Sequence, residues 1–195
     1  MACDLRSAAV GTTTGGDVAP RKATLFIFAG LPGTGKTTLS RRLASKIRGI
    51  HLRIDTLEQG LRDLCGLRVE GEGYRLAYRI AADNLRLGVD VVADSCNPIE
   101  LTREEWRRVA TDLGHPFVDI EVTCSDRGEH RRRIESRGSS IPGLVLPNWH
   151  DVDQRQYQPW SRDWIHIDTA GLSEDEAFGS LVKALETQRE PFSLD

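Results

Sequence analysis

The chain is poor in cysteine, and it has no long apolar run. Its 195 residues include four cysteines, Cys3, Cys65, Cys96 and Cys124, and no two of them form a C-x-x-C pair. This spacing excludes the usual zinc cluster and gives no sign of a disulfide framework. Buried free thiols in a reducing cytosol are therefore expected, and with them a cytoplasmic protein. No apolar run approaches the roughly 20 residues of a membrane span, so no membrane partner is expected.

A large excess of one charge is also absent. The formal net charge is −3, with 39% hydrophobic and 28% charged residues, which is the balance of a globular chain. Such a balance argues against a broad basic surface, and duplex nucleic acid is not an expected partner. Residues 1–22 lack the apolar core of a signal peptide and predict a flexible N-terminal tail. One domain is expected over residues 23–190.

Short apolar runs alternate with amphipathic segments along that domain. We expect strands at Ala23–Ala29, His51–Ile54, Val89–Ala93, Phe117–Cys124 and Trp164–Ile167. Helical spacing of apolar residues follows Lys36 and covers Tyr74–Leu85. A repeating strand–helix order predicts an α/β fold of three layers, with a five-stranded parallel sheet flanked by helices.

Polar residues mark three further helix starts. The pairs are Thr102 with Glu105, Asp126 with Glu129, and Ser173 with Glu176. In each pair the first side chain can accept from the backbone three residues on, and the acidic residue can return the bond. Helices are therefore expected to begin at these three places, the second reaching Arg137.

A glycine-rich segment directly follows the first expected strand. Its residues are Gly30, Leu31, Pro32, Gly33, Thr34, Gly35, Lys36, Thr37 and Thr38. The first eight match G-x-x-x-x-G-K-[ST], in which glycines let consecutive N–H groups turn toward an anion. Lys36 then reaches the β- and γ-phosphates, and the Thr37 hydroxyl binds Mg²⁺. A plain glycine turn is the alternative, but the position between a strand and a helix favours a phosphate site.

Three polar residues come just after expected strands. Asp94 is a candidate to hold the metal or contact a substrate, and a turn residue is its alternative role. Asp55 is a candidate base for an acceptor hydroxyl, and a helix N-cap is its alternative role. Ser125 follows the fourth expected strand. Because ligands of parallel sheets bind beyond the C-terminal strand ends, one crevice is expected to collect these residues with the glycine loop.

Arginines cluster on the helix that follows Asp126. Arg133 and Arg137 are four residues apart, hence on one helical face, and planar guanidinium groups suit the charge of a transferring phosphoryl group. Arg131 and Arg132 are expected on a solvated face instead. Arg53 has two open interpretations, a contact to a substrate anion or a solvated charge.

Residues 138–162 lack a clean periodicity and carry Pro142, Pro147 and Pro159. This stretch is long for an idle connection, so either a mobile lid, within residues 126–162, or an irregular packed excursion is expected. Trp149 and Trp160 within it are expected as packing anchors.

Taken together, these residues resemble the small P-loop kinases of the zeta-toxin-like and chloramphenicol-phosphotransferase-like group. The marks are the glycine loop, Arg53-Ile54-Asp55, Val91 to Asn97, Arg133 to Arg137, Tyr157 to Trp160, and Ile167 to Gly171. The resemblance implies ATP- and Mg²⁺-dependent phosphorylation of a hydroxyl on a small molecule or nucleotide. It implies Asp55 as base or substrate ligand, Arg133 and Arg137 against ATP beside a lid, and Thr169, Ala170 and Gly171 around the adenine.

Two other functions compete with a small-molecule kinase. A polynucleotide 5′-hydroxyl kinase needs a basic channel, for which Arg103, Arg107 and Arg108 are candidates. A non-catalytic ATP-binding sensor would bind nucleotide without transfer. The N-K-x-D motif that selects guanine is absent, which argues against a GTPase switch. A monomer or homodimer is expected.

Overall fold

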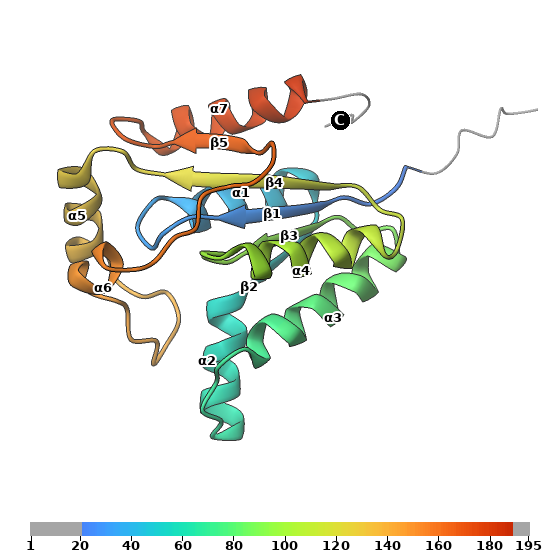
Figure 1. The fold of residues 1–195 in the computed structure, drawn as a ribbon, viewed down its shortest axis with the longest axis horizontal. Helices are drawn as coiled ribbons and strands as arrows, with labels where there is room; N and C mark the ends of the chain where they lie inside the picture. The colour runs from blue at the N-terminus through green and yellow to red at the C-terminus, as the bar shows by residue number, and fades with distance from the viewer. Residues whose placement is uncertain (1–20, 189–195) are drawn as a thin grey trace, which may run out of the picture.

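The computed structural model describes residues 21–188 and contains one five-stranded parallel sheet in the order β2-β3-β1-β4-β5 (Figure 1). The strands are β1 (Leu25–Ala29), β2 (Ile50–Arg53), β3 (Val91–Asp94), β4 (Phe117–Thr123) and β5 (Ile165–Asp168). The helices are α1 (Lys36–Ile47), α2 (Ile54–Cys65), α3 (Glu72–Arg86), α4 (Glu100–Thr111), α5 (Arg127–Ser136), α6 (Trp149–Asp153) and α7 (Glu174–Thr187). The predicted five-stranded parallel sheet is confirmed.

Strand β1 is buried on both faces, and its alternating side chains separate two cores. Phe26 and Phe28 point into the core that α1 and α7 close. Leu25 and Ile27 point into the second core, which α3 and α4 close together with the buried indole of Trp106. An apolar run without polar interruption is what a central parallel strand requires, because helices cover both of its faces.

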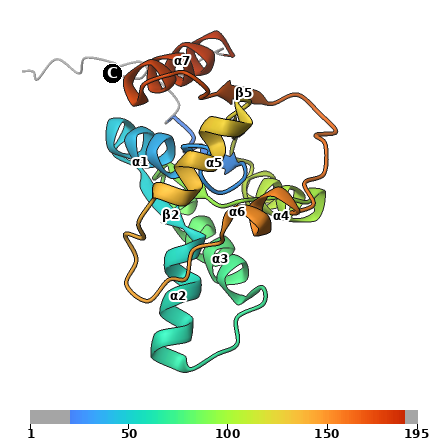
Figure 2. The ribbon, with the colours of Figure 1, turned by 90° about the vertical axis from the view of Figure 1, so that its left-hand side faces the viewer.

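The C-terminal ends of the strands gather the segments that form the candidate site. Figure 2 views the molecule from the side toward which the strand arrows of Figure 1 point, and α5 and α6 lie across this side. Helix α2 starts at the end of β2 and projects away from the sheet. The loop after β1, the end of β3 and the start of α2 therefore meet at one edge.

Two of the predicted helix caps are confirmed and one is wrong. Asp126 accepts from Glu129 N at 2.8 Å, and Ser173 forms a complete capping box with Glu176. Helix α4 instead begins at Glu100, so Thr102 lies inside its first turn and bonds back to the Ile99 carbonyl. The backbone N–H of Glu100 donates to the Gln158 side chain at 2.7 Å. A side chain 58 residues away in the sequence therefore accepts the hydrogen bond at the start of α4 that the local pattern had assigned to Thr102.

The segments around Asp55 and Trp149 also differ from the expectation. The expected strand at His51–Ile54 ends one residue earlier, and α2 begins at Ile54 with Arg53 as its N-cap residue. Asp55 therefore lies in the first turn of α2, and its role as the N-cap of a helix beginning at Thr56 is wrong. Helix α6 was not expected, because its five residues are too short to show a period; Asn148 caps it.

Two side chains attach the start of the domain to the rest of the fold. Arg21 pairs with the buried carboxylate of Asp90, and Lys22 Nζ donates to the Gly114 carbonyl at 2.8 Å. The expected tail over residues 1–22 otherwise lies outside the described residues, as does Cys3. Within residues 21–188, no helix has both the length and the apolar character that a membrane crossing requires.

A buried ion pair joins α4 to the sheet. Arg107 Nε donates to Asp119 Oδ2 at 2.8 Å, and each side chain is only 2% exposed. Arg107 also contacts Glu100 and Glu104, at 2.6 and 3.2 Å. A carboxylate this deeply buried depends on its partner, because water cannot replace the lost contact.

Arg107→Met should therefore destabilise the fold by about 3–5 kcal/mol, since it removes the partner of a buried charge while keeping most of the side-chain volume. Urea unfolding measures the loss. The matched control is Arg108→Met on the same helix: Arg108 pairs with Glu105 at the surface, with 62% and 41% exposure, and should change stability by less than about 0.5 kcal/mol. Equal effects of the two substitutions would refute the structural role of the buried pair.

Candidate nucleotide and acceptor site

The glycine loop between β1 and α1 has the backbone of an anion site. Gly30 adopts φ 140°, and a side chain there would run into the Val122 carbonyl oxygen. Gly35 is the N-cap residue of α1 with φ 92°, a left-handed conformation that glycine adopts without strain. The twelve-residue helix α1 then directs its positive N-terminal end at the same loop. These two positions are the defined glycines of the predicted motif.

Lys36 and Asp94 form an ion pair between α1 and the end of β3. Lys36 Nζ donates to Asp94 Oδ1 at 3.0 Å, with 11% and 1% of the two side chains exposed. Asp94 Oδ2 accepts no hydrogen bond among the described residues, although His51 Nε2 lies 3.5 Å away and Arg53 Nε 4.0 Å away. The buried carboxylate therefore has one oxygen free for a further polar group.

The pKa values of this pair move in opposite directions. Burial alone raises the pKa of Asp94, but the Lys36 charge and the contacts from His51 and Thr37 outweigh it and hold that pKa well below its ordinary value. Burial alone lowers the pKa of Lys36, but Asp94 outweighs it and raises that pKa. Both groups are thus charged at neutral pH.

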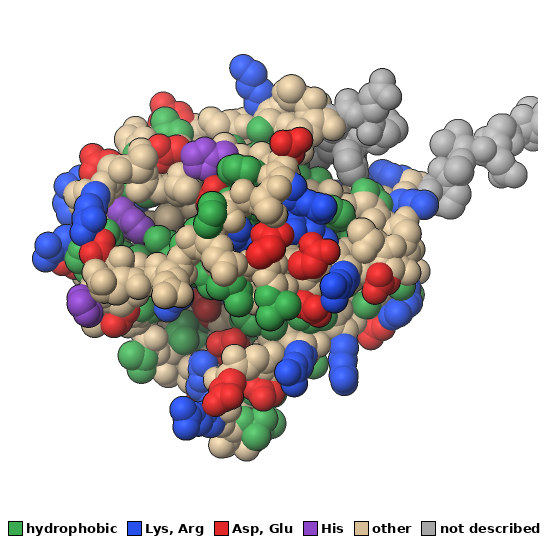
Figure 3. All heavy atoms as spheres, viewed as in Figure 1, with side chains coloured by type: hydrophobic (Ala, Val, Ile, Leu, Met, Phe, Trp, Pro, Cys, Tyr) green, Lys and Arg blue, Asp and Glu red, His purple; other side chains and the backbone are tan. Residues whose placement is uncertain are grey.

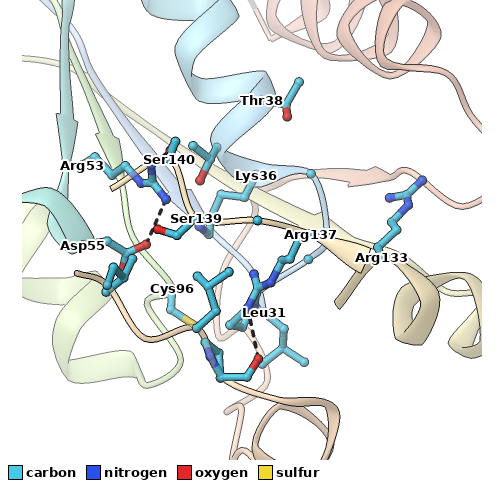
Figure 4. Close-up of a pocket in the computed structure, with 18 of the residues that line it drawn as sticks. Leu31, Lys36, Thr38, Arg53, Asp55, Cys96, Arg133, Arg137, Ser139 and Ser140 are labelled. Atoms are coloured by element: carbon cyan, nitrogen blue, oxygen red, sulfur yellow. Dashed lines mark hydrogen bonds and ion pairs between the residues drawn. The ribbon is translucent and has the colours of Figure 1, made fainter. Parts of the chain in front are cut away.

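One cavity of about 990 Å³ runs from the glycine loop to the start of α2. Its nucleotide end is bounded by the glycine loop together with Thr169, Leu172, Ser173, Glu174 and Ala177. Its acceptor end is bounded by Arg53, Asp55, Glu58, Gln59, Arg62, Cys96, Arg155 and residues 138–147. Figure 4 shows Lys36 between the two ends, with Asp55 and Arg53 on one side of it. The volume is sufficient for a nucleotide and a second small molecule.

Most of the predicted site residues line this cavity, and a few do not. Lining residues from the prediction are Leu31, Pro32, Gly33, Gly35, Lys36, Thr37, Thr38, Asp55, Arg133, Arg137 and Thr169. Gly30, Thr34, Asp94, Ser125, Ala170 and Gly171 do not line it. Asp94 and Thr34 are buried behind the wall, at 2% exposure each. Ser125 donates its N–H to Asp168 and stays outside the crevice in which it was expected.

Arg133 and Arg137 do not act as one face of a helix. Helix α5 ends at Ser136, so Arg137 is its extended C-cap residue. Arg133 donates to the Thr169 hydroxyl and carbonyl at 2.7 and 2.9 Å and also pairs with Glu129. Arg137 points elsewhere, toward Leu31, and donates to the Pro147 carbonyl at 3.4 Å (Figure 4). The arginine nearer the acceptor end is therefore Arg137.

The remaining arginines divide between the surface and the interior. Arg131 is exposed and pairs with Glu135, and Arg132 is exposed too, as expected. The basic patch expected from Arg103, Arg107 and Arg108 is wrong, because the first two are buried. On the face drawn in Figure 3, acidic and basic side chains are interspersed. The channel proposed for a polynucleotide kinase therefore loses its support.

Arg103 is buried because it holds the segment that follows α6. Its guanidinium donates to the carbonyls of Asn97, Gln158 and Pro159, at 2.9, 2.8 and 3.2 Å. The ring of Trp160 covers it at 4.2 Å. Trp160 is thus a packing anchor, as expected.

Trp149 has the same role beside α5. Its ring packs edge-on against His130 at 5.3 Å, where a packing anchor was expected.

Residues 138–147 lie over the acceptor end of the cavity. Arg53 Nη1 donates to Ser140 Oγ at 3.0 Å and Nη2 lies 3.4 Å from Asp55, so one side chain touches both the covering segment and the candidate base. The interpretation of Arg53 as a merely solvated charge is thereby disfavoured. That the segment opens and closes as a lid stays a prediction.

The sequence interpretation missed Glu58, Gln59, Cys96 and Arg155 as lining residues. Helical spacing within α2 places Glu58 and Gln59 one turn after Asp55, which is a signal that the sequence contained. Cys96 follows Asp94 by two residues. The expectation that the cysteines are buried holds for Cys124, but it is wrong for Cys96, which is half-buried, and for Cys65, which is exposed. Arg155 carried no local signal, because its position depends on how residues 138–164 fold back.

The side chains fit a P-loop Mg²⁺ ion. Among residues 21–188, no three His, Cys, Asp or Glu side chains form a cluster that would hold a metal alone. Mg²⁺ at such a loop needs fewer protein ligands, since phosphate oxygens and water complete its shell. Thr37 lines the cavity next to Lys36, and the buried Asp94 Oδ2 is without a hydrogen bond among the described residues. Thr37 and Asp94 are therefore the side chains that would hold it.

A strand, a glycine loop with its lysine, and a helix in this sheet order define a P-loop nucleotide-binding domain. Residues 25–151 match the family model described as an AAA domain, and the chain belongs to this family. A probable adenylyl-sulfate kinase from Aeropyrum pernix is 26% identical over 186 residues, covering 84% of this chain and 94% of that protein.

Solved structures show the same fold. The APS kinase of Mycobacterium tuberculosis, in complex with AMPPNP and APS, superposes with a TM-score of 0.65 at 20% identity, covering 86% of this chain and 99% of that one. A gluconokinase from Sinorhizobium meliloti gives 0.62 at 14% identity, covering 87% and 95%. Together with the family match and the adenylyl-sulfate kinase relative, these structures confirm the resemblance to small P-loop kinases.

The Lys36–Asp94 pair predicts a pH dependence of stability. Because the pKa of Asp94 is lowered on folding, its contribution is fully present above the ordinary carboxyl pKa of about 4 and is lost as the pH falls below it. Asp94→Asn should therefore cost on the order of 3 kcal/mol at pH 7, and progressively less below pH ~4. Urea unfolding at pH 7, 4 and 3 tests this. Asp83→Asn, at an exposed site of α3, is the control; a cost for Asp94→Asn that does not change with pH would contradict the pairing.

Proposed function

We propose that this protein is an ATP-dependent phosphotransferase that acts on a hydroxyl of a small molecule or nucleotide. The main support for this proposal is one cavity, which extends from the P-loop lysine, Lys36, to the carboxylate of Asp55 at the start of α2. A protein that only binds a nucleotide would not need the part of the cavity that surrounds Asp55. The similarity to a probable adenylyl-sulfate kinase supports the same class.

The nucleotide end would bind the phosphates through backbone N–H groups of the glycine loop and through Lys36. Thr169 and the apolar side chains of Leu172 and Ala177 line this end and would border the base and ribose. Ala170 and Gly171 would contribute only through the turn that places Thr169. Arg133 supports this turn, because it donates twice to Thr169.

Thr37 and Asp94 would hold Mg²⁺. When bound, the ion would neutralise charge on the phosphate oxygens. Lys36 would bind the same phosphates. The protein supplies position and charge here, which is most of what phosphoryl transfer requires.

Asp55 would orient the acceptor. Its carboxylate is 54% exposed toward the cavity, within 3.4 Å of Arg53 Nη2. The acceptor hydroxyl would donate to Asp55, which takes the proton as the oxygen bonds to the γ-phosphorus and the bond to ADP breaks. Arg137 and residues 138–147 would exclude water from the transfer. A kinase must do this to avoid hydrolysing ATP.

Asp55→Asn should lower kcat by about 100-fold or more, because the amide cannot accept the proton. The dissociation constant for Mg²⁺·ATP, measured by calorimetry, should change by less than about threefold, since Asp55 lies outside the glycine loop. Asp63→Asn on the same helix is the matched control: its exposed carboxylate does not line the cavity.

The alternative of an ATP-binding sensor predicts a different result. The wild-type protein would then bind Mg²⁺·ATP tightly, but no acceptor would be phosphorylated, and Asp55→Asn would be indistinguishable from the wild type. That pair of results would overturn the kinase assignment.

A further inference from the structure

Positive charge at the acceptor end exceeds what the protein itself neutralises. Four arginines line this end, Arg53, Arg62, Arg137 and Arg155, against the two carboxylates of Asp55 and Glu58. Lys36 and Asp94 already form their own pair. An anionic group on the bound acceptor would balance the surplus.

Two of the four arginines are already occupied. Arg62 contacts Glu58 at 3.2 Å and Gln59 at 3.4 Å. Arg53 contacts Asp55 and Ser140. Guanidinium groups held this way have fewer free donors for a ligand.

Arg137 and Arg155 are different. Neither has a carboxylate within 4.0 Å among residues 21–188. Arg137 donates only to the Pro147 carbonyl, at 3.4 Å, and its buried Nε has no hydrogen-bond partner. Arg155 reaches only the Cys96 sulfur, at 3.7 Å. Burial lowers the pKa of Arg137, and the charges of Arg53 and Arg155 lower it further against the pull of Asp55. Each of the two therefore keeps donors that face the cavity unpaired.

The other side chains that line the cavity also bear on the chemistry of the acceptor. The acceptor end of the cavity offers serines, carboxylates and guanidinium groups, with the aliphatic side chains of residues 144–146. Such a wall suits a molecule that carries hydroxyl groups.

We propose that the acceptor is a small hydroxylated anion, whose phosphate, sulfate or carboxylate group binds between Arg137 and Arg155 while a hydroxyl faces Asp55. This inference rests on the proposed function and names the substrate class of the same site. Guanidinium groups suit it, because their planar donors match the oxygens of all three anions.

The first experiment measures binding and needs no turnover. Inorganic sulfate is titrated calorimetrically into the full-length protein saturated with Mg²⁺·AMPPNP, so that the glycine loop is occupied. Arg155→Gln and Arg137→Gln should each weaken sulfate binding by roughly 10- to 100-fold and leave the AMPPNP affinity unchanged. Arg131→Gln, at the solvated face of α5, should change neither. Sulfate that does not bind to the wild type, or that binds equally to Arg155→Gln, overturns the proposal. If Arg137→Gln weakens AMPPNP instead of sulfate, Arg137 belongs to the nucleotide site and the proposed cradle is wrong.

A matched pair of competitors separates the anion from the sugar. Ribose 5-phosphate should displace sulfate, and ribose should not displace it. Ribose that displaces sulfate as well as ribose 5-phosphate does would show that the anion is not recognised, which overturns the inference. Sulfate and ribose 5-phosphate binding without transfer to any acceptor would count against the kinase, while leaving the anion site supported.

Discussion

The ion pair between Lys36 and Asp94 is the contact on which the rest of the site depends. It joins the first residue of α1 to the last residue of β3, and the two strands that lead to it, β1 and β3, are neighbours paired at Phe28 and Asp94. Both side chains are nearly inaccessible, so neither charge can be left alone without a large cost. If bound phosphates pair with Lys36, the Asp94 carboxylate needs another cation. Joint binding of nucleotide and Mg²⁺ would meet that requirement.

The loop after β3 extends the same constraint to the acceptor end. Asn97 adopts φ 44° and donates its side-chain amide to the Phe28 carbonyl at 2.8 Å, while Gly30 N donates to the Cys96 carbonyl. Arg103 fastens the same loop to Gln158, downstream of the covering segment. The glycine loop, the acceptor end of the cavity and the segment that follows residues 138–147 are therefore all attached to the loop after β3. A shift of that stretch would disturb both ends of the cavity.

The parts that the sequence predicted well are those with local signals. An unbroken apolar run and the spacing of Gly30, Gly35 and Lys36 suffice for β1, the phosphate loop and α1. The caps at Asp126 and Ser173 are equally local. The predicted cap at Thr102 was wrong because Gln158, which is far along the chain, accepts the backbone hydrogen bond at the start of α4.

Charged residues gave the poorest predictions. Arg103 and Arg107 read as surface residues, yet Asp119 and the carbonyls of residues 158–159 pair with them inside the protein. Arg133 and Arg137 share a helical face only if the helix continues, and α5 ends between them. In each case the deciding partner comes from another element, and no spacing rule within one segment reveals it.

This difference has a functional counterpart. The phosphate site is built almost entirely from one segment, β1 to α1, whereas the acceptor end combines α2, the loop after β3 and residues 137–155. Changes in α2 or in the covering segment can therefore alter the acceptor without disturbing the glycine loop. A fold of this kind supports kinases for different small molecules. On the proposed function, charges such as those of Arg137 and Arg155, which lack an acidic partner among the described residues, would decide which acceptor binds, and only the assembled structure shows that they lack one.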